Sequence, residues 1–194
     1  MKDRNIVLEE LKKYRFAHRG LHDKPEVPEN SLLAFERACE RGFGIEFDVH
    51  LTKNGKLAVM HDSGLKRVTT VRSDHLPVIP ENAHIECTTT FRTAMIIEEI
   101  TLEEAKKYPL EESDERIPEL KEVLDLVAGR VPVIVELKPR EGNHEELVKK
   151  VMEEMRAYEE KHPEGVFCLE SFNSFAVLTL KRKYPDVVRG QLGS

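Results

Sequence analysis

Residues 131–137 form the segment that most restricts how this chain can fold. They read Val-Pro-Val-Ile-Val-Glu-Leu, so the run is almost entirely apolar and carries a single charge, Glu136. A strand of this kind is needed where a parallel sheet is covered on both faces, because neither face then meets water. The segment therefore predicts a strand of a covered parallel sheet, with Glu136 as an unusual charge within it.

Strand-type and helix-type segments alternate along most of the chain. Strands are also predicted at 14–17, 43–49, 57–60 and 166–169, and one begins at 187. Helices are predicted at 1–13, 30–42, 117–129, 141–161 and 174–184, and a further one begins at 101. Such alternation is typical of parallel βαβ units, so we expect an α/β fold.

Three local signals fix details of these elements. Asn30 is predicted as the N-cap of the helix that follows it. Thr101 with Glu104 has the spacing of a capping box. The pair Asn54-Gly55 predicts a hairpin turn, after which a short return strand leads to His61.

Two carboxylates share one face of the strand at 43–49. Glu46 and Asp48 are two residues apart, so their side chains leave the strand on the same side, opposite the apolar Ile45 and Phe47. Like charges directed together into a fold are costly unless a cation or a shared proton compensates them. A hard divalent cation bound by oxygen atoms is the simplest compensation.

Five sequence blocks, in order, give the chain a specific resemblance to the glycerophosphodiester phosphodiesterase family. They are His18-Arg19-Gly20, Pro28-Glu29-Asn30, Glu46 with Asp48, the turn from Thr52 to Gly55 with His61-Asp62 after it, and Val135-Glu136-Leu137-Lys138-Pro139. The resemblance implies a TIM-type (β/α)8 barrel. Because such barrels typically need about 250 residues, we expect the barrel to be incomplete at the C-terminal end of these 194 residues.

The chain is expected to form one α/β-barrel phosphodiesterase domain over residues 1–194. Residues 63–100 contain Pro77 and Pro80 and have no sustained hydrophobic period. We therefore interpret this segment as a loop or small excursion over the mouth of the site.

Glu46, Asp48 and Glu136 are the predicted metal ligands. Three carboxylates with water suit Mg²⁺ or Ca²⁺, whereas zinc would favour Cys or His ligands. The structural alternative is a cluster of carboxylates neutralised by salt bridges at the strand ends. The motif match and the lone charge at Glu136 favour the metal site.

His18 and His61 are the predicted acid/base pair. An imidazole can give or take a proton near neutral pH, and phosphodiester cleavage needs this at the attacking and the leaving oxygen. Either histidine taken alone would more often be an ordinary core or loop residue. In the family one histidine deprotonates the nucleophile and the other protonates the leaving alcohol, and the sequence leaves the two roles open between them.

Arg19 and Lys138 are the predicted phosphate-binding residues, because each adjoins a site residue at a strand end. Their alternative role is to neutralise the neighbouring acids. Glu29 is predicted either to support the cap of the following helix or to contact the ligand. His50 shares the face of the carboxylates and can support them from behind, and the remaining histidines are interpreted as surface residues.

Composition and charge indicate which binding partners and which cellular compartment to expect. The formal charge is −6, and no basic stretch offers a face for nucleic acid. Cys39, Cys87 and Cys168 have no metal-site spacing and are interpreted as small apolar residues of a reducing compartment. With no signal-type apolar run near the N-terminus and no membrane-length segment, we expect a cytoplasmic protein without an integral membrane segment.

The expected activity is metal-dependent hydrolysis of a small glycerophosphodiester to glycerol 3-phosphate and an alcohol such as choline or ethanolamine. One alternative is a lysophospholipase D-type enzyme, for which apolar residues within 71–100 would supply a mouth for an acyl chain. A second alternative is a non-catalytic module that keeps the phosphate pocket. The presence of both histidines and all three acids argues against that module.

Overall fold

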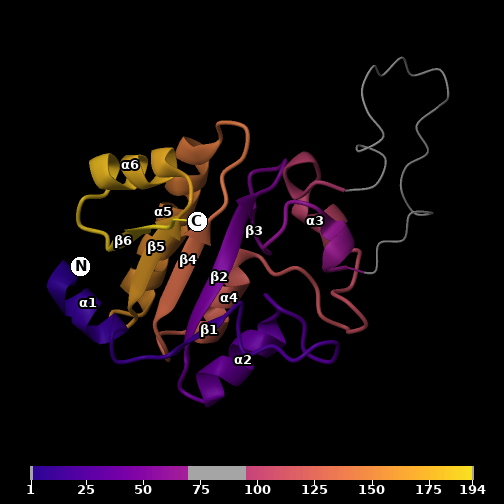
Figure 1. Ribbon diagram of the computed structural model, residues 1–194, viewed down its shortest axis with the longest axis horizontal. Helices are drawn as coiled ribbons and strands as arrows, with labels where there is room; N and C mark the ends of the chain where they lie inside the picture. Colours follow the sequence, from indigo (N-terminus) through magenta and orange to yellow (C-terminus); the bar gives the residue numbers. More distant parts are fainter. Residues whose placement is uncertain (1, 70–94, 194) are drawn as a thin grey trace.

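The computed structural model describes residues 2–69 and 95–193, and their centre is a mainly parallel sheet (Figure 1). The strands are β1 Phe16–His18, β2 Gly44–Leu51, β3 Leu57–Val59, β4 Val133–Leu137, β5 Phe167–Ser171 and β6 Arg189–Gln191. Strands β1, β2, β4, β5 and β6 are parallel in this spatial order, and β3 pairs antiparallel with β2. The predicted α/β fold with a parallel sheet is confirmed.

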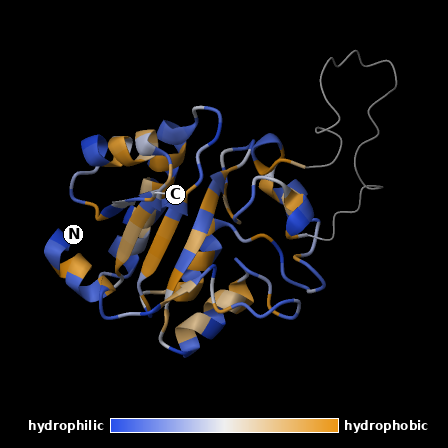
Figure 2. Ribbon diagram, viewed as in Figure 1, coloured by the Kyte–Doolittle hydropathy of each residue, from blue (hydrophilic) through white to orange (hydrophobic). Residues whose placement is uncertain are grey.

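Helices pack on the sheet through a shared apolar core. They are α2 Leu32–Glu40, α4 Leu120–Val127, α5 His144–Lys161 and α6 Ser174–Lys183, whereas α1 Arg4–Leu11 has no buried residue and α3 Leu102–Ala105 belongs to a separate apolar cluster. Ile45, Phe47 and Val135 of the sheet pack in one cluster with Val123 of α4 and Val151 of α5. Figure 2 shows the resulting apolar colouring along β2, β4 and β5. The apolar cluster lies on the face of β2 opposite Glu46 and Asp48, as the two-residue period of a strand requires.

A second apolar cluster fixes the segment that follows β3. Met60 and Leu65 pack there with Ile97, Leu102 and Ile117. Leu65 begins the short 3₁₀ helix η1, Leu65–Arg67, and Ile97 begins a second one, η3, Ile97–Glu99. His61 and Asp62 therefore leave β3 between two buried anchors, Met60 and Leu65.

The expected hairpin and capping box are both present. Gly55 has a φ of +72° in the turn between β2 and β3, a conformation that glycine adopts without strain. Thr101 and Glu104 form the reciprocal hydrogen bonds of a capping box at the start of α3. Of the predicted excursion at 63–100, residues 70–94 lie outside the described residues.

The predicted cap of α2 is wrong by one residue. Ser31 is the N-cap, and its hydroxyl accepts a hydrogen bond from the backbone N–H of Ala34 at 3.1 Å. Asn30 instead takes a left-handed φ of +55° and directs its amide to Asp48. Helix α4 also begins later than predicted, at Leu120, because the carbonyl of Pro118 accepts a hydrogen bond from Val59 of β3.

Candidate active site

Three buried acids meet on the sheet. Asp48 on β2 is directly opposite Glu136 on β4 in the parallel register, and Glu46 precedes Asp48 by two residues on the same face. One carboxylate oxygen from each residue lies within 4.8 Å of the others. The relative exposures of Glu46, Asp48 and Glu136 are 8%, 0% and 6%. The pairing of β2 with β4 thus joins residues that are almost ninety positions apart in the chain.

Burial disfavours the ionised form of these carboxylates. It raises the pKa of Glu46 to about 8, and the negative charge of Asp48 adds to the effect. Burial also raises the pKa of Glu136, against the opposing influence of Lys138. Each shift means that an ionised carboxylate is disfavoured without a compensating cation.

Lys138 supplies one compensating charge. Its ammonium lies 2.6 Å from Glu136 Oε1 and 3.2 Å from Asp48 Oδ1. Neither of these oxygens accepts a hydrogen bond of good geometry from any described group, although both are fully buried. The two contacts are therefore ion pairs, and the oxygens still have unused lone pairs.

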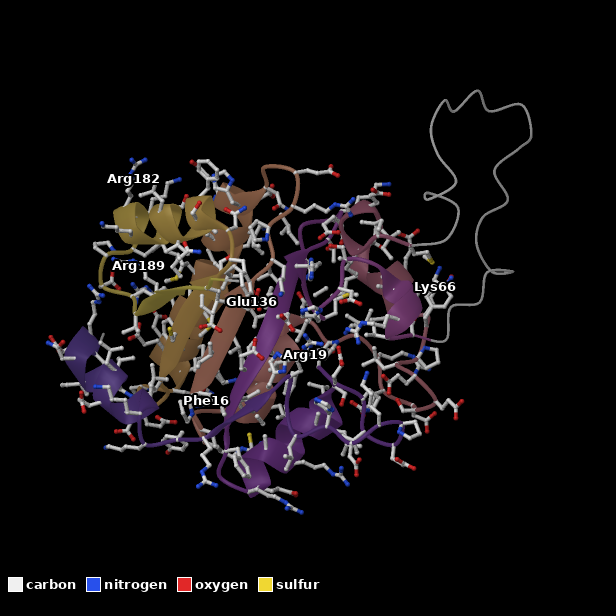
Figure 3. The ribbon with its side chains drawn as sticks, viewed as in Figure 1. Phe16, Arg19, Lys66, Glu136, Arg182 and Arg189 are labelled. Carbon is white, nitrogen blue, oxygen red and sulfur yellow. The ribbon has the colours of Figure 1, made fainter. Side chains whose placement is uncertain are left out.

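Arg19 approaches the acids from the turn after β1, and two successive left-handed residues place it there. Arg19 has a φ of +57° and Gly20 a φ of +81°. A Cβ at position 20 would lie 2.8 Å from the Cβ of Ala34, so only glycine fits. The backbone N–H of Arg19 donates to Glu46 at 3.2 Å, and its Nε is 3.7 Å from Asp48 Oδ2. Figure 3 labels Glu136 on the central strands and Arg19 beside β2.

Asn30 and Glu29 support this arrangement. The Nδ2 of Asn30 donates to Asp48 Oδ2 at 3.1 Å, and its backbone N–H donates to the carbonyl of Arg19 at 2.9 Å. Glu29 accepts from Arg19 Nη1 at 3.0 Å. Both polar residues of Pro28-Glu29-Asn30 thus bind groups of the site.

The two predicted histidines take different positions beside the acids. His18 ends β1, where its Nε2 is 3.8 Å from Glu46 and its side chain is 68% exposed. Partial burial and the charge of Arg19 lower the pKa of His18. His61 follows β3, and its Nδ1 lies 2.6 Å from Asp62 Oδ1. A neutral His61 with its Nδ1–H donated to Asp62 keeps Nε2 free to accept a proton.

A pocket of about 270 Å³ opens beside His61 and the acids. Its lining includes His61, Glu136, Lys138 and Phe172. The ring of Phe172 is 55% exposed, and the Lys138 ammonium lies 5.9 Å from its centre. The pocket therefore combines an ammonium group and an imidazole with one aromatic wall.

The chemistry of the acids fits a hard divalent cation. Asp48 Oδ1 and Glu136 Oε1 are buried oxygens that share a single cation, the Lys138 ammonium, and the raised pKa of Glu46 falls when positive charge is added. All three residues offer oxygen, which Mg²⁺ and Ca²⁺ prefer. Glu46, Asp48 and Glu136 would hold such an ion.

Sequence reasoning missed Glu170, which lies close to the three acids. Glu170 lies next to Glu136 in the register of β5, and burial together with Glu136 and Asp48 raises the pKa of Glu170. Its place at the end of a predicted strand was the available signal. His50, which the sequence predicted as a support for the carboxylates, is buried and contacts other groups: its Nδ1 lies 2.7 Å from Glu98 and its Nε2 3.0 Å from the carbonyl of His61.

Two of the three cysteines lie among the described residues. Cys39 and Cys168 are buried free thiols, as the apolar pattern around them indicated. No helix among the described residues has the length and apolarity needed to cross a bilayer.

The fold and the site together define an α/β protein with a buried cluster of three acids on a parallel sheet. The family model described as the Glycerophosphoryl diester phosphodiesterase family matches residues 18–194. The chain belongs to this family. Its sheet matches the TIM-barrel structures of the family over part of their length, as the sequence predicted.

Relatives and solved structures agree with this assignment. A glycerophosphodiester phosphodiesterase of Caldanaerobacter subterraneus is 31% identical, covering 94% of this chain and 67% of its own. A lysophospholipase D of Homo sapiens is 30% identical, covering 80% and 46%. An Oleispira antarctica phosphodiesterase, solved in complex with the product sn-glycerol-3-phosphate, is 26% identical with a TM-score of 0.73, covering 93% and 66%. A Thermotoga maritima glycerophosphodiester phosphodiesterase is 26% identical with a TM-score of 0.62, covering 93% and 62%. The chain thus spans about two thirds or less of these proteins.

Proposed function

We propose that the chain hydrolyses glycerophosphodiesters to glycerol 3-phosphate and an alcohol, with a divalent cation held by Glu46, Asp48 and Glu136. The convergence of three buried carboxylate oxygens within 4.8 Å of one another carries this proposal. Mg²⁺ or Ca²⁺ is the proposed ion, because the ligands are hard oxygen atoms. When bound, it would supply positive charge to stabilise the negative charge that develops on the phosphate oxygens.

The chain's own residues supply the rest of the chemistry. Lys138 and Arg19 are cations within ion-pair distance of Asp48, so they can attract and orient a phosphate beside the acids. His61 and His18 exchange protons with the attacking and the leaving oxygen. One imidazole accepts the proton of the attacking oxygen, and the other, in its protonated form, gives a proton to the leaving alcohol.

The alcohol is proposed to be small, and one observation favours a larger apolar substrate as the second candidate. Phe172 lines the pocket and exposes 55% of its surface beside Lys138. An aromatic wall next to a phosphate-binding cation suits a lysophospholipid, whose cleavage would make the chain a lysophospholipase D-type enzyme. The apolar residues within 71–100 that also suggested this activity lie largely outside the described residues.

The test compares two substrates on the metal-free protein after addition of Mg²⁺ or Ca²⁺. We expect glycerol 3-phosphate from glycerophosphocholine, and a lower kcat/KM for lysophosphatidylcholine. Faster cleavage of the lipid would replace the proposed substrate class with the second candidate. Binding of glycerol 3-phosphate without turnover under either metal would instead indicate a non-catalytic phosphate-binding module.

A further inference from the structure

The short helix η1 brings an unassigned arginine, Arg67, to the edge of the site. Leu65 at its start is fully buried, and its backbone N–H donates to the carbonyl of Met95 at 2.9 Å. This anchor fixes the turn that begins three residues after Asp62. The side chain of Arg67 therefore extends from a defined backbone position close to the His61-Asp62 pair.

Arg67 bridges two carboxylates from distant parts of the chain. Its Nε donates to Asp62 Oδ2, and its Nη2 donates to Glu29 Oε1 at 2.6 Å. The other oxygen of Asp62 lies 2.6 Å from His61 Nδ1. The same Glu29 oxygen also accepts from Arg19 Nη1 at 3.0 Å. A continuous chain of contacts thus runs from His61 to Arg19.

Glu29 lies in the middle of this series of contacts, and its ionised form keeps the two arginines in place. Glu29 is only 6% exposed, and a buried carboxylate persists as an ion only when cations bind it. Burial favours its neutral form, yet hydrogen bonds from Arg67 and Lys24 lower the pKa of Glu29 to about 2. Its negative charge therefore holds both Arg19 and Arg67 at neutral pH.

The geometry of a guanidinium suits this position. Its donors are fixed in one plane, so Arg67 can bind Asp62 through Nε while Nη2 binds Glu29. A lysine ammonium at the end of a flexible stem is a single point charge and does not reproduce this fixed pair of contacts. The arrangement thus depends on arginine itself and not only on positive charge.

We propose that Arg67 is a positioning residue that couples His61 to Arg19 through Asp62 and Glu29. It keeps the Asp62 carboxylate directed at His61 Nδ1, which leaves His61 Nε2 as the atom that exchanges protons with substrate. It also braces Glu29, which holds the Arg19 guanidinium beside Asp48. The catalytic part of this role rests on the proposed phosphodiesterase function.

A role in positioning is distinguishable from a role in stability. The ion pair of Arg67 with Asp62 joins side chains that are 42% and 31% exposed, so it contributes little to folding, whereas the pair of Arg67 with the buried Glu29 adds to stability. Catalysis, by contrast, is sensitive to small errors in the orientation of reacting groups. Loss of Arg67 should therefore lower turnover far more than it lowers thermal stability.

The first experiment measures kcat, KM and Tm for glycerophosphocholine hydrolysis with Mg²⁺. Arg67→Ala is expected to lower kcat by about 10–100-fold, while the loss in Tm leaves the protein folded at the assay temperature. Arg67→Lys should recover only part of this loss. Lys66→Ala is the matched control, because Lys66 lies on the same turn, forms no ion pair with described residues and lies at the periphery in Figure 3. Wild-type kcat in Arg67→Ala, or an equal loss in Lys66→Ala, would overturn the proposal.

A second experiment tests the same coupling without any turnover. Nitrogen-15 NMR of neutral imidazoles at about pH 8 reports which ring nitrogen of His61 carries the proton, with the signal assigned from its loss in His61→Ala. We expect a single Nδ1–H form in the wild type and in Lys66→Ala, and a mixture with the Nε2–H form in Arg67→Ala. An unchanged His61 signal in Arg67→Ala would contradict the positioning role even if the protein proved to have no phosphodiesterase activity.

Discussion

Asp48 on β2 and Glu136 on β4 lie opposite each other in the parallel register of the sheet, and both carboxylates are buried. Like charges placed opposite each other on neighbouring strands destabilise a sheet unless a cation offsets them. Lys138 lies within ion-pair distance of both, at Asp48 Oδ1 and Glu136 Oε1, so one ammonium offsets two buried carboxylates. The register itself therefore creates a place for a cation.

Removal of a single acid should weaken cation binding. Glu46→Gln and Glu136→Gln each replace a charged oxygen ligand by a neutral amide. Loss of a group that merely orients a ligand costs about 10–100-fold in metal affinity, so we expect at least that loss here. Isothermal titration with Mg²⁺ or Ca²⁺ measures it, with the exposed Glu146→Gln of α5 as the control. Wild-type affinity in both site variants would remove these acids from the proposed cation site.

Loss of either histidine should separate catalysis from cation binding. His18→Ala and His61→Ala are expected to lower kcat by about 10²–10⁴-fold, because each removes a group that exchanges protons with the reacting oxygens. Cation affinity should stay near wild type, since the proposed ligands are carboxylates. The exposed His22→Ala serves as the control. A variant with near wild-type kcat would exclude that histidine from proton transfer.

Two adjacent substitutions should separate the helix cap from the site. Ser31→Ala removes the cap of α2 and should cost about 1 kcal/mol of the free energy of unfolding, with little effect on cation affinity. Asn30→Gly permits the same left-handed backbone but removes the amide that donates to Asp48, so cation affinity should fall. Chemical denaturation and cation titration together measure both effects. The reverse pattern would restore Asn30 as the cap.

Acid should remove the stability that Glu29 contributes. Its pKa is about 2 in the folded chain against an ordinary 4.5, so the folded state favours the ionised form. The contribution is therefore fully present above about pH 4.5 and declines as the pH falls toward about 2. The Tm difference between the wild type and Glu29→Gln should be larger at about pH 6 than at about pH 3. An equal difference at both values would contradict this account of Glu29.

The sequence predicted the acids because each leaves a local signal. Glu46 and Asp48 share a strand face by spacing alone, and Glu136 is the one charge in an apolar strand. Their convergence depends on the pairing of β2 with β4, which the family resemblance supplied and the register now specifies. The proposed roles of these residues remain predictions.

Other groups could not be found in this way because their roles depend on backbone conformation or on distant contacts. Asparagine is a common N-cap residue, so the sequence predicted a cap at Asn30. Only the left-handed φ of Asn30 turns its amide toward Asp48. Arg67 meets Glu29 across a separation of 38 residues, and no local period records such a contact. The start of α4 was misplaced because Pro118 pairs with β3, a tertiary contact that overrides the helical pattern.

The most direct test of the whole account is a crystal of the protein soaked with Mn²⁺ and examined by anomalous diffraction. We expect one strong peak about 2.0–2.6 Å from carboxylate oxygens of Glu46, Asp48 and Glu136, with the Lys138 ammonium moved away from the ion. A site that stays without a peak, with Lys138 still paired to Asp48 and Glu136, or a peak held by other residues, would contradict it.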